Sequence, residues 1–193
     1  MRKPVSFGAN LGHPSAFGRF LALLILCSVL SVSAYAQTLI VAFGASNVAG
    51  KGVSPSEAWP AQLEGMLKAK GYNVRIKNAG KSGDTTSGML HRLFFAVPSG
   101  TKIVILDTCG GYYNNRKTTI ASQARGHEDM QAIETKLKSG GIAVVPECTG
   151  DLPLSLKQPD KIHLTAEGHK VVAERLLSRV IRALDGSSQV GSG

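Results

Sequence analysis

The sequence is poor in the residues that mark several special classes of protein. Only 3 of its 193 residues are cysteine, 1 is tryptophan, and aromatic residues make up 6% of the chain. Three cysteines are too few for a disulfide-rich scaffold, and the chain has no collagen-like repeat. With 43% apolar residues, the composition is that of one ordinary globular domain rather than a disordered chain.

Acidic residues are also scarce, since 13 Asp and Glu stand against 22 Lys and Arg, a formal net charge of +9. The basic residues do not gather in a run, and aromatic residues are not interleaved with them. The sequence therefore argues against a nucleic-acid partner. The excess charge favours acidic substrates or loose contact with an anionic membrane surface.

The N-terminal segment has the three parts of a secretory signal peptide. Arg2, Lys3 and Arg19 form a basic region without an acidic residue, an apolar run covers 20–32, and an A-x-A cleavage site occupies 34–36. An uncleaved N-terminal anchor is the alternative, although the run is shorter than the roughly 20 residues that span a bilayer.

We therefore expect a signal peptide over 1–36, cleaved after Ala36, and a folded domain over 37–185. The last residues, 186–193, are rich in Gly and Ser and are expected to form a disordered tail. Cleavage would leave the domain in the periplasm or in the medium.

Apolar runs alternate with segments of helical periodicity along the rest of the chain. Runs typical of strands buried on both faces occur at 38–43, 74–78, 102–108 and 141–146. Helical spacing of apolar residues predicts helices over 56–71, 86–95, 130–139 and 165–184. Ser56 and Thr165 are the expected N-caps of the first and last of these helices. This alternation predicts an α/β fold with a parallel sheet covered by helices on both faces.

Ligands of such sheets bind beyond the carboxyl ends of the strands. Ser46 directly follows the first predicted strand, and Gly44 and Gly50 let the backbone turn sharply around it. A serine at such a turn is either exposed as a nucleophile or only caps the turn.

A serine nucleophile needs a base, and the base needs an orienting group. The D-K-I-H sequence before the last helix supplies both, because His163 would take the proton from Ser46 and Asp160 would hold the imidazole. A loop ion pair explains Asp160 and His163 equally well when they are taken alone. His169 lies further along the helix and is expected at the surface.

Gly83 follows the second predicted strand, where a glycine lets a backbone N–H point into a pocket, as an oxyanion requires. The neighbouring A-G-K-S sequence imitates the end of a phosphate-binding loop, but Arg75 stands where that motif needs glycine. No H-E-x-x-H or paired C-x-x-C sequence is present, so we expect no metal and no cofactor.

Taken in their order, Ser46, Gly83, an Asn-bearing loop and the Asp160-x-x-His163 block resemble the SGNH (GDSL-type) hydrolases, especially the small periplasmic lysophospholipase, arylesterase and thioesterase branch. The resemblance covers 38–184. It implies a three-layer α/β/α, flavodoxin-like fold and a monomer that hydrolyses small or lipid-like esters or thioesters. The G-x-S-x-G elbow of ordinary α/β-hydrolases does not fit, because Val48 occupies its second glycine position.

The resemblance also implies the role of each residue. Ser46 would be the nucleophile, His163 the base and Asp160 the orienting group. The backbone N–H groups of Ser46 and Gly83 would donate to the oxyanion.

Two blocks depart from the family pattern. Ala45 stands where the family usually has the Asp of Gly-Asp-Ser. The third block usually reads Gly-x-Asn-Asp, and its Asn side chain donates to the oxyanion, whereas 109–115 reads C-G-G-Y-Y-N-N. Alignment on the glycines puts Tyr112 in the position of this Asn, and a Tyr hydroxyl could also donate. Asn114 could fill the role only if the loop is rearranged, and we prefer it to Asn115 as the third donor. Tyr112 and Tyr113 would line the substrate pocket.

The short segment between Pro146 and Asp160 predicts a reduced sheet and an open acyl pocket, since relatives carry a further helix and strand there.

The altered third block also leaves a second interpretation, a ligand-binding module that does not catalyse. If His163 acts as the base, activity should fall below a pH near 6–7, where an ordinary imidazole protonates.

Two of the three cysteines, Cys109 and Cys148, each follow a predicted strand, and those strands are expected to be neighbours. Their Cα atoms would then fall within the roughly 4.4–6.8 Å that a disulfide requires, and an oxidising periplasm would favour the bond. Two buried thiols are the alternative.

Overall fold

The computed structural model describes residues 37–189, so the signal peptide expected over 1–36 lies outside the described residues. Its strands are β1 (Thr38–Gly44), β2 (Val74–Gly80), β3 (Thr101–Asp107) and β4 (Ala143–Glu147). Its helices are α2 (Ser46–Ala49), α3 (Trp59–Ala69), α4 (Thr86–Ala96), α5 (Gly110–Asn115), α6 (Ile120–Ala124), α7 (Gly126–Ser139) and α8 (Ala166–Gln189), with a 3₁₀ turn over Leu154–Leu156. The predicted α/β class is confirmed.

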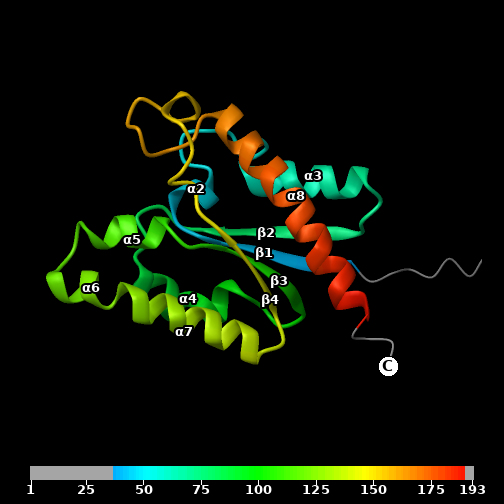
Figure 1. The fold of residues 1–193 in the computed structure, drawn as a ribbon, viewed down its shortest axis with the longest axis horizontal. Helices are drawn as coiled ribbons and strands as arrows, with labels where there is room; N and C mark the ends of the chain where they lie inside the picture. The colour runs from blue at the N-terminus through cyan, green and yellow to red at the C-terminus, as the bar shows by residue number, and fades with distance from the viewer. Residues whose placement is uncertain (1–36, 190–193) are drawn as a thin grey trace, which may run out of the picture. The chain divides into compact units, whose positions relative to one another are not determined.

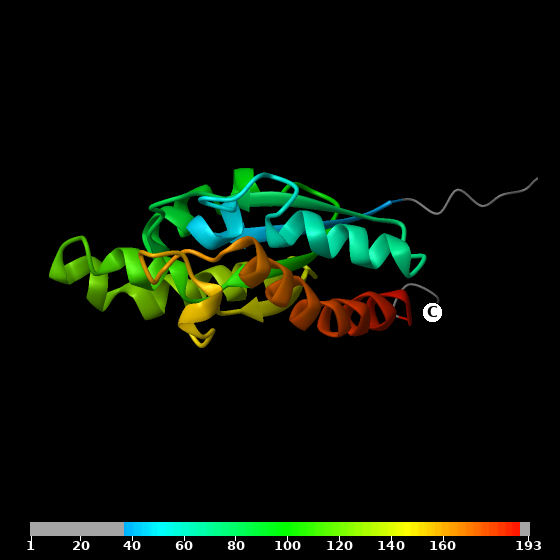
Figure 2. The same ribbon diagram turned by 90° about the horizontal axis from the view of Figure 1, so that it is seen from above.

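The four strands form one parallel sheet in the order β2-β1-β3-β4. Ile40 of β1 pairs with Ile76 of β2 on one side and with Ile103 of β3 on the other. Helices α3 and α8 cover one face of the sheet, and α4 and α7 cover the other (Figure 1 and Figure 2). The sheet is therefore the middle layer of three.

Alternate residues of β1 enter two separate cores. Ile40 and Ala42 pack against the α3–α8 side, whereas Val41 and Phe43 pack against the α4–α7 side. All four are fully buried. A central strand of a parallel sheet has no solvent face, and this explains why the sequence of β1 is a continuous apolar run.

Two helix ends differ from the prediction. The N-cap of α3 is Ala58 rather than Ser56, and Pro60 lies in the first turn, where the missing N–H of proline costs nothing. At the other end of the chain α8 continues past residue 185 to Gln189. Extending an existing helix by a few residues is easier than starting one, even through Gly and Ser.

The short helices α2, α5 and α6 were not predicted from the sequence. None of them exceeds six residues, which is too short for apolar periodicity to be visible. Within residues 37–189, no helix combines the length and the apolar character needed to cross a membrane.

Candidate active site

The residues predicted to form a triad meet at the carboxyl end of the sheet. Ser46 is the first residue of α2, directly after β1, and the loop before α8 carries Asp160 and His163 (Figure 1). His163 Nε2 lies 3.0 Å from Ser46 Oγ, and His163 Nδ1 lies 2.5 Å from Asp160 Oδ2. Residues 117 positions apart in the sequence are thus joined in one hydrogen-bonded chain.

The Asp160 carboxylate is held in its ionised form. The hydrogen bond from the His163 side chain, together with the backbone N–H groups of His163 and Ile162 at 2.9 Å each, keeps the pKa of Asp160 well below its usual range. An ionised carboxylate at Nδ1 fixes the imidazole so that Nε2 faces the serine.

Asn47 joins the serine turn to the histidine loop, a role that the sequence did not reveal. Its amide nitrogen donates to Thr149 Oγ1 at 3.0 Å and to the Ile162 carbonyl at 3.3 Å, and its oxygen accepts from the Leu164 backbone N–H at 3.2 Å. The last two of these bonds hold the backbone on both sides of His163. The position of Asn47 directly after Ser46 was the only available signal.

Asp107, at the end of β3, supports the turn from the opposite side. One carboxylate oxygen accepts from the Ala45 backbone N–H at 3.1 Å, and the other accepts from Cys109 and Gly110 at 3.0 and 2.8 Å. The carboxylate that is missing from position 45 is thus supplied from a neighbouring strand. Asp107 also went unnoticed in the sequence, because it reads as the polar end of an apolar run.

Close approach explains the glycine that precedes this turn. A Cβ added at Gly44 would lie 2.2 Å from Asp107 Cβ and 2.6 Å from a methyl group of Val48. No side chain fits between these neighbours, so the turn that presents Ser46 requires glycine at this position.

Two backbone N–H groups, in the segments that follow the neighbouring strands β1 and β2, have no acceptor among the described residues. They belong to Ser46 and Gly83. Gly83 has a φ of 78°, a left-handed conformation that glycine adopts without strain. These are the two donors that the sequence predicted for an oxyanion.

A half-buried arginine anchors the Gly83 loop. Arg92 of α4 pairs with Asp84 at 2.6 Å, and its other nitrogens donate to the carbonyls of Ala79 and Gly44 at 2.8 and 2.9 Å. It therefore ties the ends of β1 and β2 to the loop that follows β2.

A cleft of about 390 Å³ opens beside Ser46. It is lined by Ser46, Asn47, Thr108, Cys109, Gly110, Tyr112, Tyr113, Asn114, Arg116, Thr149, Gly150, Lys157, Lys161 and Ile162. At its edge, Cys109 and Cys148 are joined by a disulfide with a Cα–Cα distance of 5.3 Å, so the structure contains the bond rather than two thiols.

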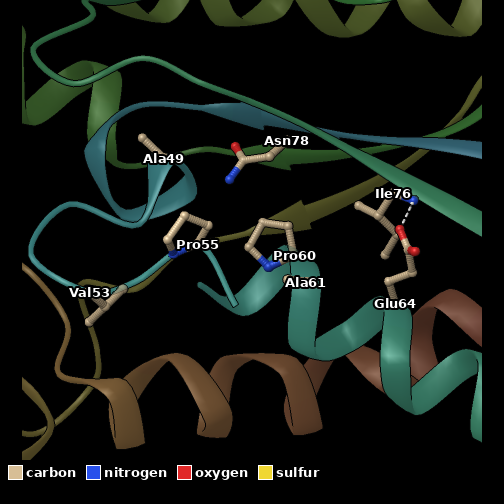
Figure 3. A pocket seen from close by; sticks show the side chains of 8 residues that line it. All are labelled: Ala49, Val53, Pro55, Pro60, Ala61, Glu64, Ile76 and Asn78. Atoms are coloured by element: carbon tan, nitrogen blue, oxygen red, sulfur yellow. Dashed lines mark hydrogen bonds between the residues drawn. The ribbon is translucent and has the colours of Figure 1, made fainter. Parts of the chain in front are cut away.

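Another pocket, of about 300 Å³, lies between α3 and the β2 edge of the sheet (Figure 3). It contains none of Ser46, Asp160 and His163, and its one carboxylate, Glu64, accepts from the Ile76 backbone N–H at 2.6 Å. The cleft beside Ser46 is therefore the candidate active site. Over the described part of the chain, no group of three or more His, Cys, Asp or Glu side chains is arranged to hold a metal ion.

No family model matches the chain. In a comparison with curated proteins, the chain is similar to Esterase TesA of Pseudomonas aeruginosa, with 45% identity over 117 residues. The match covers 61% of this chain and 56% of that esterase, so it spans just over half of the relative's length.

Solved structures share the fold. The psychrotrophic esterase EstA of Pseudoalteromonas sp., in a form inhibited by monoethylphosphonate, superposes with a TM-score of 0.63 at 15% identity, over 77% of this chain and 100% of its own. The crystal structure of TesA gives a TM-score of 0.60 at 22% identity, over 77% and 98%. In fold the chain is therefore similar to the SGNH (GDSL-type) hydrolases, as its sequence motifs predicted.

The segment compared with the family's third block forms α5 in the structure. Asn114 is buried, lines the cleft and donates one amide hydrogen to the Asp84 carbonyl at 2.8 Å. Asn115 faces away, and both ends of its amide are bonded to Thr86. Tyr112 also lines the cleft, and burial together with nearby acidic side chains raises the pKa of its hydroxyl.

Proposed function

We propose that this protein is an exported serine ester hydrolase that acts through an acyl-enzyme on Ser46. The observation that carries the proposal is the hydrogen-bonded chain from Asp160 through His163 to Ser46, which ends in the 390 Å³ cleft. A serine hydroxyl bonded to an imidazole that is itself oriented by a carboxylate is the arrangement that activates this weak nucleophile.

In the first half of the reaction, Ser46 Oγ attacks the carbonyl carbon of the ester while His163 Nε2 takes the hydroxyl proton. The tetrahedral intermediate then collapses, the bond to the leaving alcohol or thiol breaks, and His163 returns the proton to the leaving group. Asp160 stays ionised throughout and stabilises the imidazolium.

In the second half, His163 takes a proton from a water molecule, which attacks the acyl-enzyme. Collapse of the second intermediate returns the proton to Ser46 Oγ and releases the carboxylic acid. The chemistry is complete with the side chains of this chain, because proton transfer and nucleophilic attack are its only steps.

The developing oxyanion would be held by the free backbone N–H groups of Ser46 and Gly83. The second amide hydrogen of Asn114, which is not used by Asp84, is the third donor that we favour. Tyr112 is the competing donor. Removal of one such donor typically lowers turnover by about 10²–10³.

The proposed substrates are small or poorly enclosed esters, with thioesters, aryl esters and lysophospholipids included in the same chemistry. Esterase is the activity named for both TesA and EstA, and the cleft is bounded by a four-stranded, reduced sheet. Because all three members of the triad come from one chain, a monomer is sufficient.

Export is supported by two features of the chain. The Cys109–Cys148 bond is of a kind that persists outside the reducing cytosol, and the first 36 residues have the pattern of a signal peptide. We propose cleavage after Ala36 and residence in the periplasm or the medium.

Hydrolysis of 4-nitrophenyl esters from acetate to octanoate tests the proposal. The mature protein should release nitrophenol from at least the short esters, Ser46→Ala should lose all turnover above the uncatalysed rate, and Asp160→Asn should lose most of it. Turnover of no ester by folded protein would contradict the proposal and favour a binding module in which Tyr112 and Tyr113 contact a ligand.

A further inference from the structure

The candidate active-site cleft is lined by positive charge from two separate elements. Arg116 directly follows α5 on one side, and Lys157 and Lys161 lie in the loop that carries Asp160 and His163 on the other. No Asp or Glu is among the residues that line the cleft.

These three cations have no carboxylate partner within the described range. Lys157 Nζ donates only to the Gly150 carbonyl, at 3.2 Å. Two carboxylates of the same loop region are already engaged, Asp160 by His163 and Asp151 by Arg175. Their charge is therefore uncompensated at the mouth of a cleft, where it raises the local concentration of anions.

The backbone conformation at Lys161 favours glycine, so the fold itself gives no reason for a lysine at this position. Lys161 has a φ of 61°, and among residues 37–189 no other non-glycine residue has a positive φ. Glycine adopts this conformation without strain, whereas a residue with a Cβ is disfavoured. Hydrogen bonds from Lys161 N to the Gln158 carbonyl and from Gln158 N to the His163 carbonyl hold the loop in this shape.

A strained residue that the surrounding structure maintains points to a function of its side chain. We propose that Arg116, Lys157 and Lys161 form an anion subsite that selects esters carrying a carboxylate or phosphate group beside the scissile bond. This inference rests on the proposed function of Ser46, and it names the substrate class of that same site. A soluble acidic ester and an anionic phospholipid share this chemistry.

Two matched pairs of substrates measure the preference. The 4-nitrophenyl ester of adipic acid carries a free carboxylate, and that of monomethyl adipate is neutral with the same leaving group. Lysophosphatidylglycerol carries a net negative charge, and lysophosphatidylcholine carries none. A preference within the first pair alone assigns a soluble ester, and a preference within the second pair assigns a lipid headgroup.

We expect kcat/KM for the anionic member of at least one pair to exceed that of its neutral partner. The ratio should fall about two- to fivefold in each of Arg116→Gln, Lys157→Gln and Lys161→Gly, the range for loss of an exposed ion pair. It should also fall with added salt, because the Debye length shrinks from about 30 Å at 0.01 M to about 3 Å at 1 M.

Lys161→Gly separates the subsite from the fold, since glycine relieves the backbone strain. Its thermal midpoint should equal or exceed that of the wild type while its preference for the anionic ester falls. Lys102→Gln is the matched control: it removes one charge from an exposed position near the start of β3, at the other end of the sheet, and should leave the ratio unchanged.

Equal kcat/KM within both pairs would overturn the proposal while leaving the esterase intact, and so would a preference that all three variants retain. A preference that Lys102→Gln reduces as much as the others would assign the effect to net charge and also overturn the subsite. Failure to hydrolyse any member of either pair would instead refute the proposed function.

Discussion

At the scale of single residues, the serine turn is built mainly by acceptors of backbone N–H groups. Asp107 accepts three such bonds from two separate segments, and Asn47 links Ser46's own helix to the histidine loop. In the proposed mechanism both are positioning residues, because they touch the backbone on either side of Ser46 and His163 rather than these side chains themselves. A small shift of the backbone held by Asp107 or Asn47 would change the distance between Ser46 and His163.

Asp107→Asn should therefore reduce both stability and turnover. An amide has one oxygen, so its NH₂ group must face at least one of the backbone N–H donors, and the free energy of unfolding should fall by about 1–3 kcal/mol. If Ala45 N loses its acceptor, kcat should fall more than KM rises, since the turn that presents Ser46 is loosened. Urea unfolding and steady-state kinetics measure the two effects.

Asp185→Asn is the matched control for this change. It removes the same charge from an exposed carboxylate near the end of α8 whose side chain accepts from Tyr72 Oη at 3.3 Å. It should leave kcat unchanged. An Asp107→Asn protein with wild-type kcat would show that this carboxylate does not position the serine.

At the scale of elements, the strands and long helices were predictable and the short helices around the site were not. Thr38–Gly44 reads as a buried strand because both of its faces are apolar, and α8 reads as a helix because its apolar residues recur over many turns. Helix α5 has no such pattern. It is held by Asp107, by the Cys109–Cys148 bond and by the Asp84 carbonyl, contacts from distant parts of the sequence.

The disulfide is the covalent part of this support. It joins Cys109, the N-cap of α5, to the end of β4 across 39 residues, and the Cys148 carbonyl accepts from Arg175 of α8 at 2.7 Å. Cleavage of this bond would free the start of the helix that carries Asn114.

We expect reduction of the bond to lower the free energy of unfolding by about 2–4 kcal/mol, the usual contribution of a disulfide that closes a loop of this size. Turnover should fall as well, because Asn114 is then less well fixed. Urea unfolding and ester hydrolysis with and without dithiothreitol measure both effects. The Cys109→Ser/Cys148→Ser protein should have the stability and turnover of the reduced wild type, and dithiothreitol should change neither. An equal response of both proteins to dithiothreitol would contradict this account.

At the scale of the whole molecule, a buried histidine links the two helices on one face of the sheet. His169 of α8 is fully buried and its Nδ1 accepts from the Trp59 backbone N–H at the start of α3, at 3.2 Å. The surface position expected for it from the sequence is wrong, because the first turn of α8 faces α3. Its Nε2 is buried without a hydrogen-bond partner in the described part of the protein.

This burial makes stability depend on pH. Desolvation lowers the pKa of His169 to about 4, although Glu57 opposes the shift. Because the unfolded chain binds the proton more readily, the stabilisation is complete above the unfolded pKa of about 6.5 and is lost as the pH falls toward 4. The loss should be of the order of 3 kcal/mol.

Urea unfolding at several pH values between 4 and 7 measures this dependence in the wild type and in His169→Asn, whose amide oxygen can still accept from Trp59 N. The variant should lose less stability over this range than the wild type, since all other titrating groups are shared. His91→Gln, at an exposed position of α4, should behave as the wild type does. Identical pH profiles for the wild type and His169→Asn would contradict the assignment.

The central claim is that Ser46 is a nucleophile activated by His163 and Asp160. A fluorophosphonate probe tests it most directly, and a phosphonate is also the inhibitor in the EstA structure. Intact-mass analysis of residues 37–193 should show one adduct, located on Ser46 by peptide mapping, with Ser46→Ala unlabelled and His163→Gln labelled far more slowly. Folded wild-type protein that remains unlabelled, or a label on another residue, would contradict the claim.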